Sequence, residues 1–222
     1  MHVSFERTAQ EAPLGTVLLA HGYAEHCGRY AHLRCALTRA GYDVAYYDHA
    51  GHGTSDGPRA RVDVGALIRD FGDARRAALA HARTPELFLF GHSMGGITAL
   101  GVVTAEEDIA GAVSMNGSGW WNESDRRFRA AWKISWRPFF AEMIGRINRA
   151  DPYNRPEALR RKSVLLLNGG ADDVVDNAAQ AMYADRLSSE HIDAEHIVYD
   201  GLGHFVTTNM MGDAVAWLDR HI

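Results

Sequence analysis

The sequence predicts one α/β domain built on a mainly parallel sheet, and two patterns lead to this prediction. Short apolar runs alternate along the chain with longer amphipathic stretches. The runs are apolar along their whole length, which is typical of parallel strands covered by helices on both faces of the sheet. A chain of 222 residues is long enough to bury a full core, and one domain is the expected count.

The strands are expected at the apolar runs. The run 16–20 is apolar after Thr16 and is followed by His21-Gly22, which predicts a buried strand that ends in a turn. Further runs predict strands at 42–47, 87–90, 110–115, 164–168 and 195–199, and an antiparallel edge strand at 3–7. The sheet should therefore contain six to eight strands.

Helices are expected between these strands. Leu33, Leu37 and Ala40 recur at helical spacing before Gly41 ends the pattern. Comparable patterns predict helices over about 64–78, from about 94 onward, and over about 177–187 and 209–220. Each of these helices follows a predicted strand, which completes the alternation.

The segment 116–163 breaks the alternation because it is too long for a single crossover. We interpret about 117–160 as a compact helical cap inserted into the domain. Its aromatic side chains either form a core face or bind a substrate, and the candidates for binding are Trp120, Trp121, Trp132, Trp136 and Phe139. Tryptophan also suits a membrane interface, so transient contact of the cap with a membrane surface is a further expectation.

The composition excludes several classes of function. The net charge is −5 and no basic stripe runs along any segment, so no nucleic-acid partner is expected. No signal-peptide pattern or bilayer-spanning apolar window occurs, which predicts a cytoplasmic protein. Cys27 and Cys35 lack metal-ligand spacing and are expected to be free thiols. No metal and no organic cofactor are expected. The glycine-rich segments lack the G-x-G-x-x-G form and the P-loop lysine of nucleotide-binding loops.

One pentapeptide carries the strongest chemical signal, the G-x-S-x-G motif Gly91-His92-Ser93-Met94-Gly95. It follows a predicted strand and opens a helix, where a serine sits on a sharp and strained turn. Small neighbours two residues before and after Ser93 relieve the crowding of such a turn. The helix N-terminus behind Ser93 favours developing negative charge. Ser93 is therefore the predicted nucleophile.

A serine nucleophile needs a base to take its proton, and the base needs a carboxylate that orients it. His204 follows the last predicted strand and is the predicted base. Asp172 is the first carboxylate after the strand at 164–168, and it is preferred over its rivals Asp173 and Asp176. The chain order of serine, acid and histidine is that of the α/β hydrolases.

The oxyanion that forms during acyl transfer needs two backbone donors. One should be the amide after the nucleophile, on Met94. The other should come from the loop after the strand at 16–20, and we assign it to Tyr23.

The sequence resembles the monoacylglycerol lipase and lysophospholipase branch of the α/β hydrolases, from about residue 14 to the C-terminus. The resemblance rests on His21-Gly22-Tyr23-Ala24-Glu25-His26 with Gly28-Arg29-Tyr30, on Asp48 with Gly51-His52-Gly53-Thr54-Ser55-Asp56-Gly57, and on Gly91-His92-Ser93-Met94-Gly95-Gly96. It implies the α/β-hydrolase fold, an eight-stranded sheet, a cap after the sixth strand, and hydrolysis of lipid-like esters. By position, it implies the triad Ser93, Asp172 and His204, with Tyr23 and Met94 at the oxyanion hole.

Two departures from that branch bear on the substrate. The chain is shorter than is usual there, mainly through a compact cap, and Ala50 stands where an arginine is common. From the motifs and the resemblance, the leading hypothesis is a serine hydrolase that cleaves carboxylic esters of small-molecule, lipid-like substrates. The alternatives are a short-chain carboxylesterase, a thioesterase or a lactonase, and a binding protein that has retained the fold without catalysis.

Overall fold

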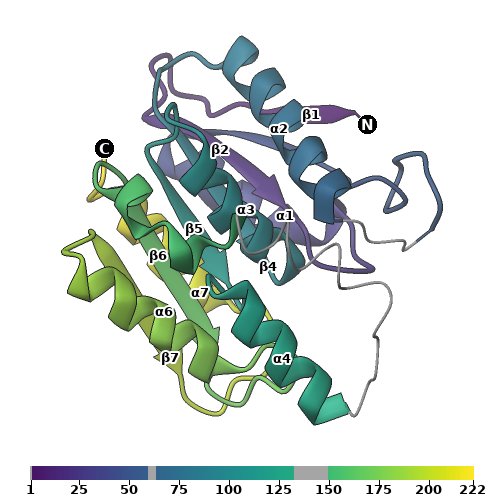
Figure 1. Cartoon of the computed structure of the whole chain (residues 1–222). Helices are drawn as coiled ribbons and strands as arrows, with labels where there is room; N and C mark the ends of the chain where they lie inside the picture. The colour runs from purple at the N-terminus through teal and green to yellow at the C-terminus, as the bar shows by residue number, and fades with distance from the viewer. Residues whose placement is uncertain (1, 60–63, 133–149) are drawn as a thin grey trace.

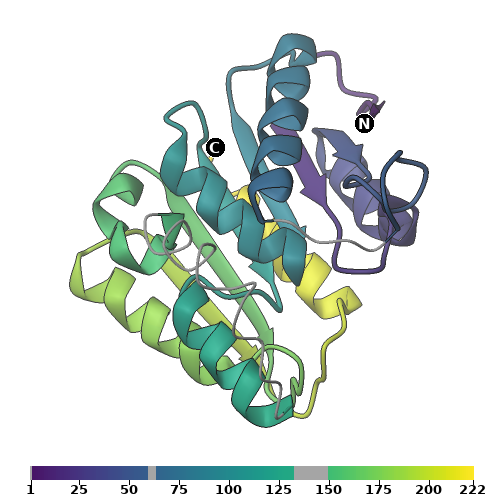
Figure 2. The same cartoon turned by 45° about the vertical axis from the view of Figure 1, so that its right-hand side comes forward.

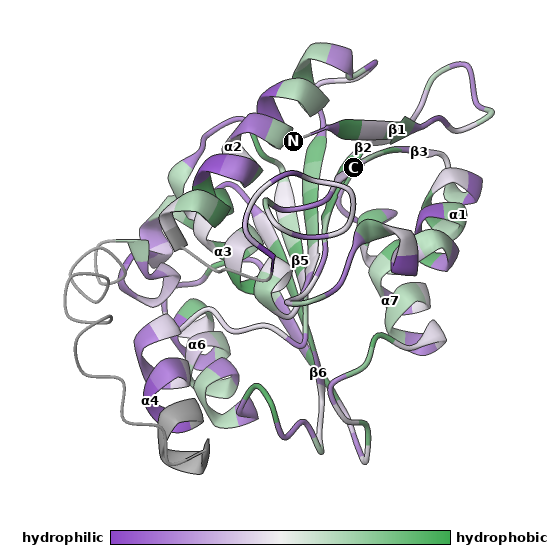
Figure 3. Cartoon of the chain, turned by 90° about the vertical axis from the view of Figure 1, so that its right-hand side faces the viewer, coloured by the Kyte–Doolittle hydropathy of each residue, from purple (hydrophilic) through white to green (hydrophobic). Residues whose placement is uncertain are grey.

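The computed structural model describes residues 2–59, 64–132 and 150–222, and it has three layers (Figure 1). A central sheet is covered on one face by α1 (Ala31–Ala40) and α7 (Thr208–Leu218). The other face is covered by α2 (Val64–His81), α3 (Met94–Ala105) and α6 (Asn177–Ser189), and α4 (Trp121–Trp132) packs beside α6 (Figures 2 and 3). This is the α/β-hydrolase architecture that the sequence predicts.

The described residues form one sheet of seven strands in the order β1-β3-β2-β4-β5-β6-β7. Only β1 pairs antiparallel, at the edge, as predicted. The strands are β1 (Val3–Glu6), β2 (Gly15–Ala20), β3 (Tyr42–Tyr47), β4 (Leu87–His92), β5 (Gly111–Met115), β6 (Ser163–Gly169) and β7 (Ala194–Tyr199). The count falls within the predicted six to eight and is one below the eight that the resemblance implies.

Two hydrophobic cores explain why the strands are apolar throughout. Side chains alternate between the two faces of a strand. Leu18 and Leu89 therefore pack under α2 and α3, whereas Leu19 and Phe90 pack under α1 and α7. All four are fully buried. A strand that contributes to both cores cannot show the polar and apolar alternation of a half-exposed strand.

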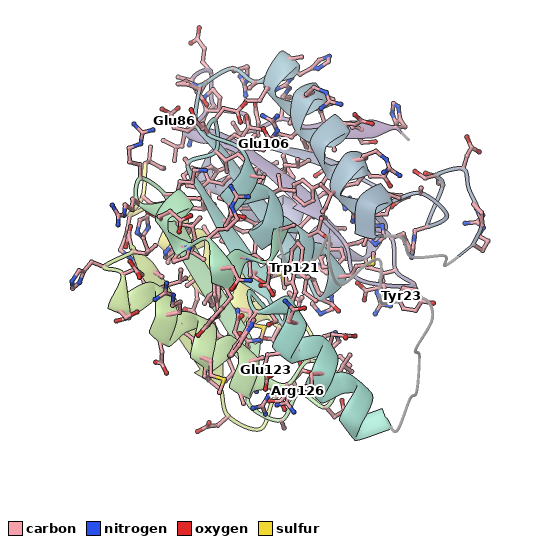
Figure 4. The ribbon with its side chains drawn as sticks, viewed as in Figure 1. Tyr23, Glu86, Glu106, Trp121, Glu123 and Arg126 are labelled. Atoms are coloured by element: carbon pink, nitrogen blue, oxygen red, sulfur yellow. The ribbon has the colours of Figure 1, made fainter. Side chains whose placement is uncertain are left out.

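The strand order determines where chemistry can occur. Because β2, β4, β6 and β7 run parallel, the loops that follow them emerge at the same edge of the sheet. These loops contain Tyr23, Ser93, Asp172 and His204 respectively. In Figure 4, Tyr23 lies toward this end of the molecule, and Glu86 and Glu106 lie toward the opposite end.

The predicted cap lies in the segment between β5 and β6, which are the fifth and sixth of the described strands along the chain. Its described part contains α4 and the short 3-10 helices η2 (Pro152–Asn154) and η3 (Pro156–Leu159). Its two ends meet at Asp151, whose carboxylate accepts hydrogen bonds from the amides of Trp121 (3.1 Å), Asn122 (3.1 Å) and Tyr153 (3.2 Å). The amide of Tyr153 also donates to the Gly119 carbonyl at 2.9 Å. The two ends of the predicted cap are therefore hydrogen-bonded to each other at a buried carboxylate.

Two smaller predictions can be compared with the structure. Cys27 and Cys35 are free thiols, as expected. The Cys27 thiol is buried and donates to the carbonyl of Tyr47 at 2.8 Å, and burial raises the pKa of Cys27 to about 12. Among the described helices, none combines the length and the apolar composition that a membrane crossing requires.

Candidate active site

Ser93 sits at the turn between β4 and α3 with φ 52° and ψ −118°. A positive φ at a residue other than glycine is uncommon and costs energy. The turn is held by two backbone hydrogen bonds, from the Ser93 amide to the Met115 carbonyl (2.8 Å) and from the Ile97 amide to the Ser93 carbonyl (2.9 Å). The strained strand-to-helix turn predicted from the motif is therefore present.

The glycines around Ser93 are required by close backbone packing. A Cβ atom on Gly91 would overlap the backbone of Gly95, and one on Gly95 would overlap the carbonyl of Ala20. A Cβ atom on Gly96 would lie 2.7 Å from the Ser114 hydroxyl oxygen. Since the first two obstacles are backbone atoms, no side-chain movement could relieve them. The motif thus brings α3 against the ends of β2 and β4.

His204 lies between Ser93 and Asp172. Its Nδ1 is 2.7 Å from Asp172 Oδ2, and its Nε2 is 2.8 Å from Ser93 Oγ. An ionised carboxylate only accepts hydrogen bonds, so Nδ1 carries the proton and donates it to Asp172. In the neutral ring, Nε2 is then the acceptor for the Ser93 hydroxyl. This arrangement prepares Ser93 to lose its proton to His204.

Asp172 is suited to orient His204. Its side chain is fully buried, and its other oxygen accepts the amides of Val174 and Val175, both at 2.9 Å. Burial alone would raise the pKa of Asp172, but the hydrogen bonds from His204 and from the two amides lower the pKa below its ordinary value. Asp172 is therefore ionised at neutral pH.

The two rival carboxylates lie elsewhere. Asp176 caps α6 by accepting from the Ala178 amide at 2.7 Å, and it forms an ion pair with Arg127 at 3.1 Å. Asp173 is exposed. Of the three candidate acids, Asp172 is the one that hydrogen-bonds to His204.

The loop after β2 lies beside the nucleophile turn. A Cβ atom on Gly95 would also crowd the His21 carbonyl, and one on Gly22 would lie 3.1 Å from His92 Nδ1. The residue after Gly22 is Tyr23, and Met94 is the first residue of α3. Both predicted oxyanion donors thus belong to backbone segments that pack against each other at Ser93. Their role as donors stays a prediction.

These two segments are tied together by three side chains to which the sequence motifs assign no role: Tyr30 and His92, which are buried, and Glu25, which is partly buried. Glu25 Oε2 accepts from the Gly22 amide (3.1 Å), the Tyr30 hydroxyl (2.5 Å) and His92 Nδ1 (3.2 Å). Partial burial opposes ionisation, but the hydrogen bonds from His92 and Tyr30 lower the pKa of Glu25 to about 2. The sequence signal for this group was the presence of Glu25, Tyr30 and His92 in the motifs at 21–30 and 91–96.

The aromatic candidates for substrate binding are only partly described. Trp121 is buried, and its ring packs on Gly101 of α3, where no Cβ atom would fit. Trp120 stacks on Tyr153 with ring centroids 4.0 Å apart. These contacts are those of a core face. The side chain of Trp132, and all of Trp136 and Phe139, lie outside the described residues. Within the parts of the chain that are described, no group of three or more His, Cys, Asp or Glu side chains is arranged to hold a metal ion.

Fold and site together define a serine hydrolase of the α/β-hydrolase class. A family model described as "Serine aminopeptidase, S33" matches residues 11–155, and the chain belongs to that family. It is 28% identical to the monoacylglycerol lipase of Mycolicibacterium smegmatis, over 97% of this chain and 91% of that protein.

Two solved structures share the fold. The monoacylglycerol lipase of Paleococcus ferrophilus matches with a TM-score of 0.73 and 21% identity, over 100% of this chain and 99% of that one. A carboxyl esterase of Bacillus coagulans in complex with glycerol matches with a TM-score of 0.78 and 16% identity, over 99% and 93%.

Proposed function

We propose that the protein hydrolyses lipid-like acyl esters, such as monoacylglycerols, through an acyl-enzyme on Ser93. The observation that carries the proposal is the unbroken chain of hydrogen bonds from Ser93 Oγ through His204 to Asp172. A positioned base that is oriented by a buried carboxylate activates a serine hydroxyl. The strained backbone of Ser93 keeps that hydroxyl at the turn, above the end of β4.

The reaction follows from these positions. As Ser93 Oγ bonds to the acyl carbon, its proton passes to His204 Nε2, and Asp172 stabilises the imidazolium that results. The negative charge on the former carbonyl oxygen is held by the backbone N–H groups of Tyr23 and Met94. The alcohol leaves with the proton of His204. A water molecule then gives a proton to His204 and attacks the acyl-enzyme, which releases the acid and restores Ser93.

The apolar surroundings support an acyl substrate. Three large apolar side chains adjoin the site residues and are exposed: Tyr23 (54%), Val174 (36%) and Phe205 (70%). Tyr23 is in the loop after β2, Val174 follows Asp172 by two residues, and Phe205 follows His204 directly. Contact with an acyl chain would remove this surface from water. The similarity to a monoacylglycerol lipase over nearly the whole chain points to the same substrate class.

Hydrolysis of p-nitrophenyl esters from acetate to long acyl chains, and of a thioester and a lactone, with Ser93→Ala measured alongside, tests the proposal. Activity that peaks at long chains and disappears in the variant is the expected result. A peak at short chains would identify a short-chain carboxylesterase. Activity restricted to thioesters or lactones would reassign the substrate class, and no activity with any substrate would favour a binding role.

The proposal includes a cap at about 117–160 within one domain and transient contact of that cap with a membrane surface. Liposome flotation of the wild type and of a Trp120→Ala variant tests the membrane contact, because Trp120 is only partly buried whereas Trp121 is buried. Weaker flotation of the variant is expected. Unchanged flotation would give Trp120 a purely internal role.

A further inference from the structure

Asn116 is a buried polar residue directly after β5, and its backbone is left-handed with φ 50°. Asparagine tolerates this conformation better than most residues other than glycine. The Asn116 amide donates to the carbonyl of Leu167 in β6 at 2.7 Å. The sharp change of direction after the strand turns the Asn116 side chain toward the loops that follow β6 and β7, as its hydrogen bonds show.

The side-chain amide of Asn116 bonds to both of those loops. Its Oδ1 accepts from the Gly169 amide at 2.8 Å, and its Nδ2 donates to the Phe205 carbonyl at 3.0 Å. Gly169 starts the loop that carries Asp172, since the Asp172 amide donates to the Gly169 carbonyl at 3.2 Å. Phe205 is the residue after His204. We call the loop after β6, which carries Asp172, the acid loop, and the loop after β7, which carries His204, the base loop. The Asn116 side chain therefore joins the acid loop to the base loop.

The backbone around His204 makes this bridge consequential. The Phe205 amide donates to the Gly203 carbonyl at 2.9 Å, which places His204 at the tip of a three-residue turn. The Ala171 amide donates to the Leu202 carbonyl at 2.8 Å, so the acid loop also holds the start of this turn. The end of the turn, at Phe205, is held by Asn116 Nδ2. Without the hydrogen bond from Asn116 Nδ2 to Phe205, the bond from Ala171 to Leu202 would still hold the start of the turn, but the end of the turn would be released.

We propose that Asn116 is a positioning residue that fixes His204 relative to Asp172 and Ser93. This inference rests on the proposed function, because it assumes that His204 is the base. An amide is the group required: the Gly169 N–H needs an acceptor and the Phe205 carbonyl needs a donor, and a primary amide supplies both. Aspartate has nearly the same shape and tolerates the same backbone, but an ionised carboxylate has no proton to donate to Phe205.

The test is Asn116→Asp, assayed with the p-nitrophenyl ester that the wild type hydrolyses best. Displacement of His204 from Ser93 slows proton transfer. Phe205 moves with the released turn, whereas Tyr23 and Val174, the other two exposed apolar side chains, stay in place. We expect kcat per folded protein to fall by about tenfold or more, and by a larger factor than KM rises. The fraction of folded protein is measured by thermal unfolding.

Asn168→Asp is the matched control. Asn168 is equally buried, lies one strand away, and donates from Nδ2 to a backbone carbonyl, that of Gly117, at 3.3 Å. Gly117 belongs to neither the acid loop nor the base loop. This variant should lose stability while its kcat per folded protein stays within about twofold of the wild type. If Asn116→Asp fails to fold, Asn116→Gly replaces it, since glycine accepts the positive φ and lacks the amide.

Three outcomes are decisive. A fall of kcat in the Asn116 variant that exceeds the fall in Asn168→Asp supports the inference. A kcat within twofold of the wild type, or an equal fall in both variants, overturns it. Ser93→Ala separates this failure from a failure of the proposed function: if Ser93→Ala loses activity and the Asn116 variant keeps it, only the positioning role is wrong.

Discussion

Asp172 and Asp151 are both buried carboxylates that accept backbone amides, but their pKa values move in opposite directions. Asp172 accepts two amides and the Nδ1–H of His204, and its pKa is lowered. Asp151 accepts three amides and the side-chain amide of Asn122, yet burial dominates and raises its pKa. The first lies in the candidate active site, and the second fastens the two ends of the segment between β5 and β6.

The difference lies in the partner that can carry positive charge. Amide donors alone do not offset the cost of burying the Asp151 charge, whereas His204 adds a partner whose protonated form attracts Asp172. In the proposed reaction, Asp172 pairs with a group that becomes a cation during turnover. The amide donors on Asp151 are neutral, and Asp151 remains easier to protonate.

The largest effect is expected at the catalytic side of this comparison. Ser93→Ala removes the nucleophile and should lower kcat by about a millionfold, which is the size of loss expected when a catalytic serine works together with its histidine. Stopped assays over hours with the preferred p-nitrophenyl ester measure the residual rate. A variant that keeps more than a few per cent of the activity would exclude Ser93 as the nucleophile.

Asp172→Asn should have the next largest effect, a fall in kcat of about 10⁴-fold, because an amide in place of the carboxylate favours the wrong tautomer of His204. Asp173→Asn is the matched control one residue away, and its kcat should stay within about twofold of the wild type. Steady-state kinetics of both variants measure the contrast. The reverse pattern would assign the acid to Asp173.

In the segment between β5 and β6, which Asp151 holds, a substitution is expected to lower stability. Trp121→Ala removes a buried ring from Gly101 and should lower the free energy of unfolding by about 3–5 kcal/mol. Urea titration measures this change, and KM is measured on the same sample below its unfolding transition. A raised KM with unchanged stability would instead make Trp121 a substrate contact.

The smallest expected effect is a pH dependence of opposite sign for the two carboxylates. The lowered pKa of Asp172 gives stability that is present above its unfolded-state pKa and lost as the pH falls through the folded-state pKa. The raised pKa of Asp151 gives a contribution that is fully present below the unfolded-state pKa and lost as the pH rises through the folded-state pKa.

Urea titrations between about pH 3 and 7, with Asp172→Asn and Asp151→Asn as references, measure these two slopes. As the pH falls, the wild type should lose stability relative to Asp172→Asn and gain it relative to Asp151→Asn. Slopes of the same sign for both pairs would contradict the distinction between the two carboxylates.

The fold was predictable because its signals are local. Strands that contribute to both cores are apolar throughout, and the observed strands begin and end within about two residues of the predicted ones. The positions of Ser93, Asp172 and His204 after strand ends were also predictable, because parallel strands deliver such residues to one edge. The bridge through Asn116 was not, since it joins residues 53 and 89 positions apart. The same holds for Glu25 and His92, which are 67 positions apart and meet only in the folded chain.

Covalent labelling tests the central claim, that Ser93 is a nucleophile activated by His204, most directly. The wild type and the Ser93→Ala and His204→Ala variants are incubated with a serine-directed phosphonate, and the adducts are located by peptide mass spectrometry. One adduct on Ser93 in the wild type, none in Ser93→Ala and much slower labelling in His204→Ala is the predicted result. An adduct on another residue, or a wild type that stays unlabelled while folded, would contradict the account.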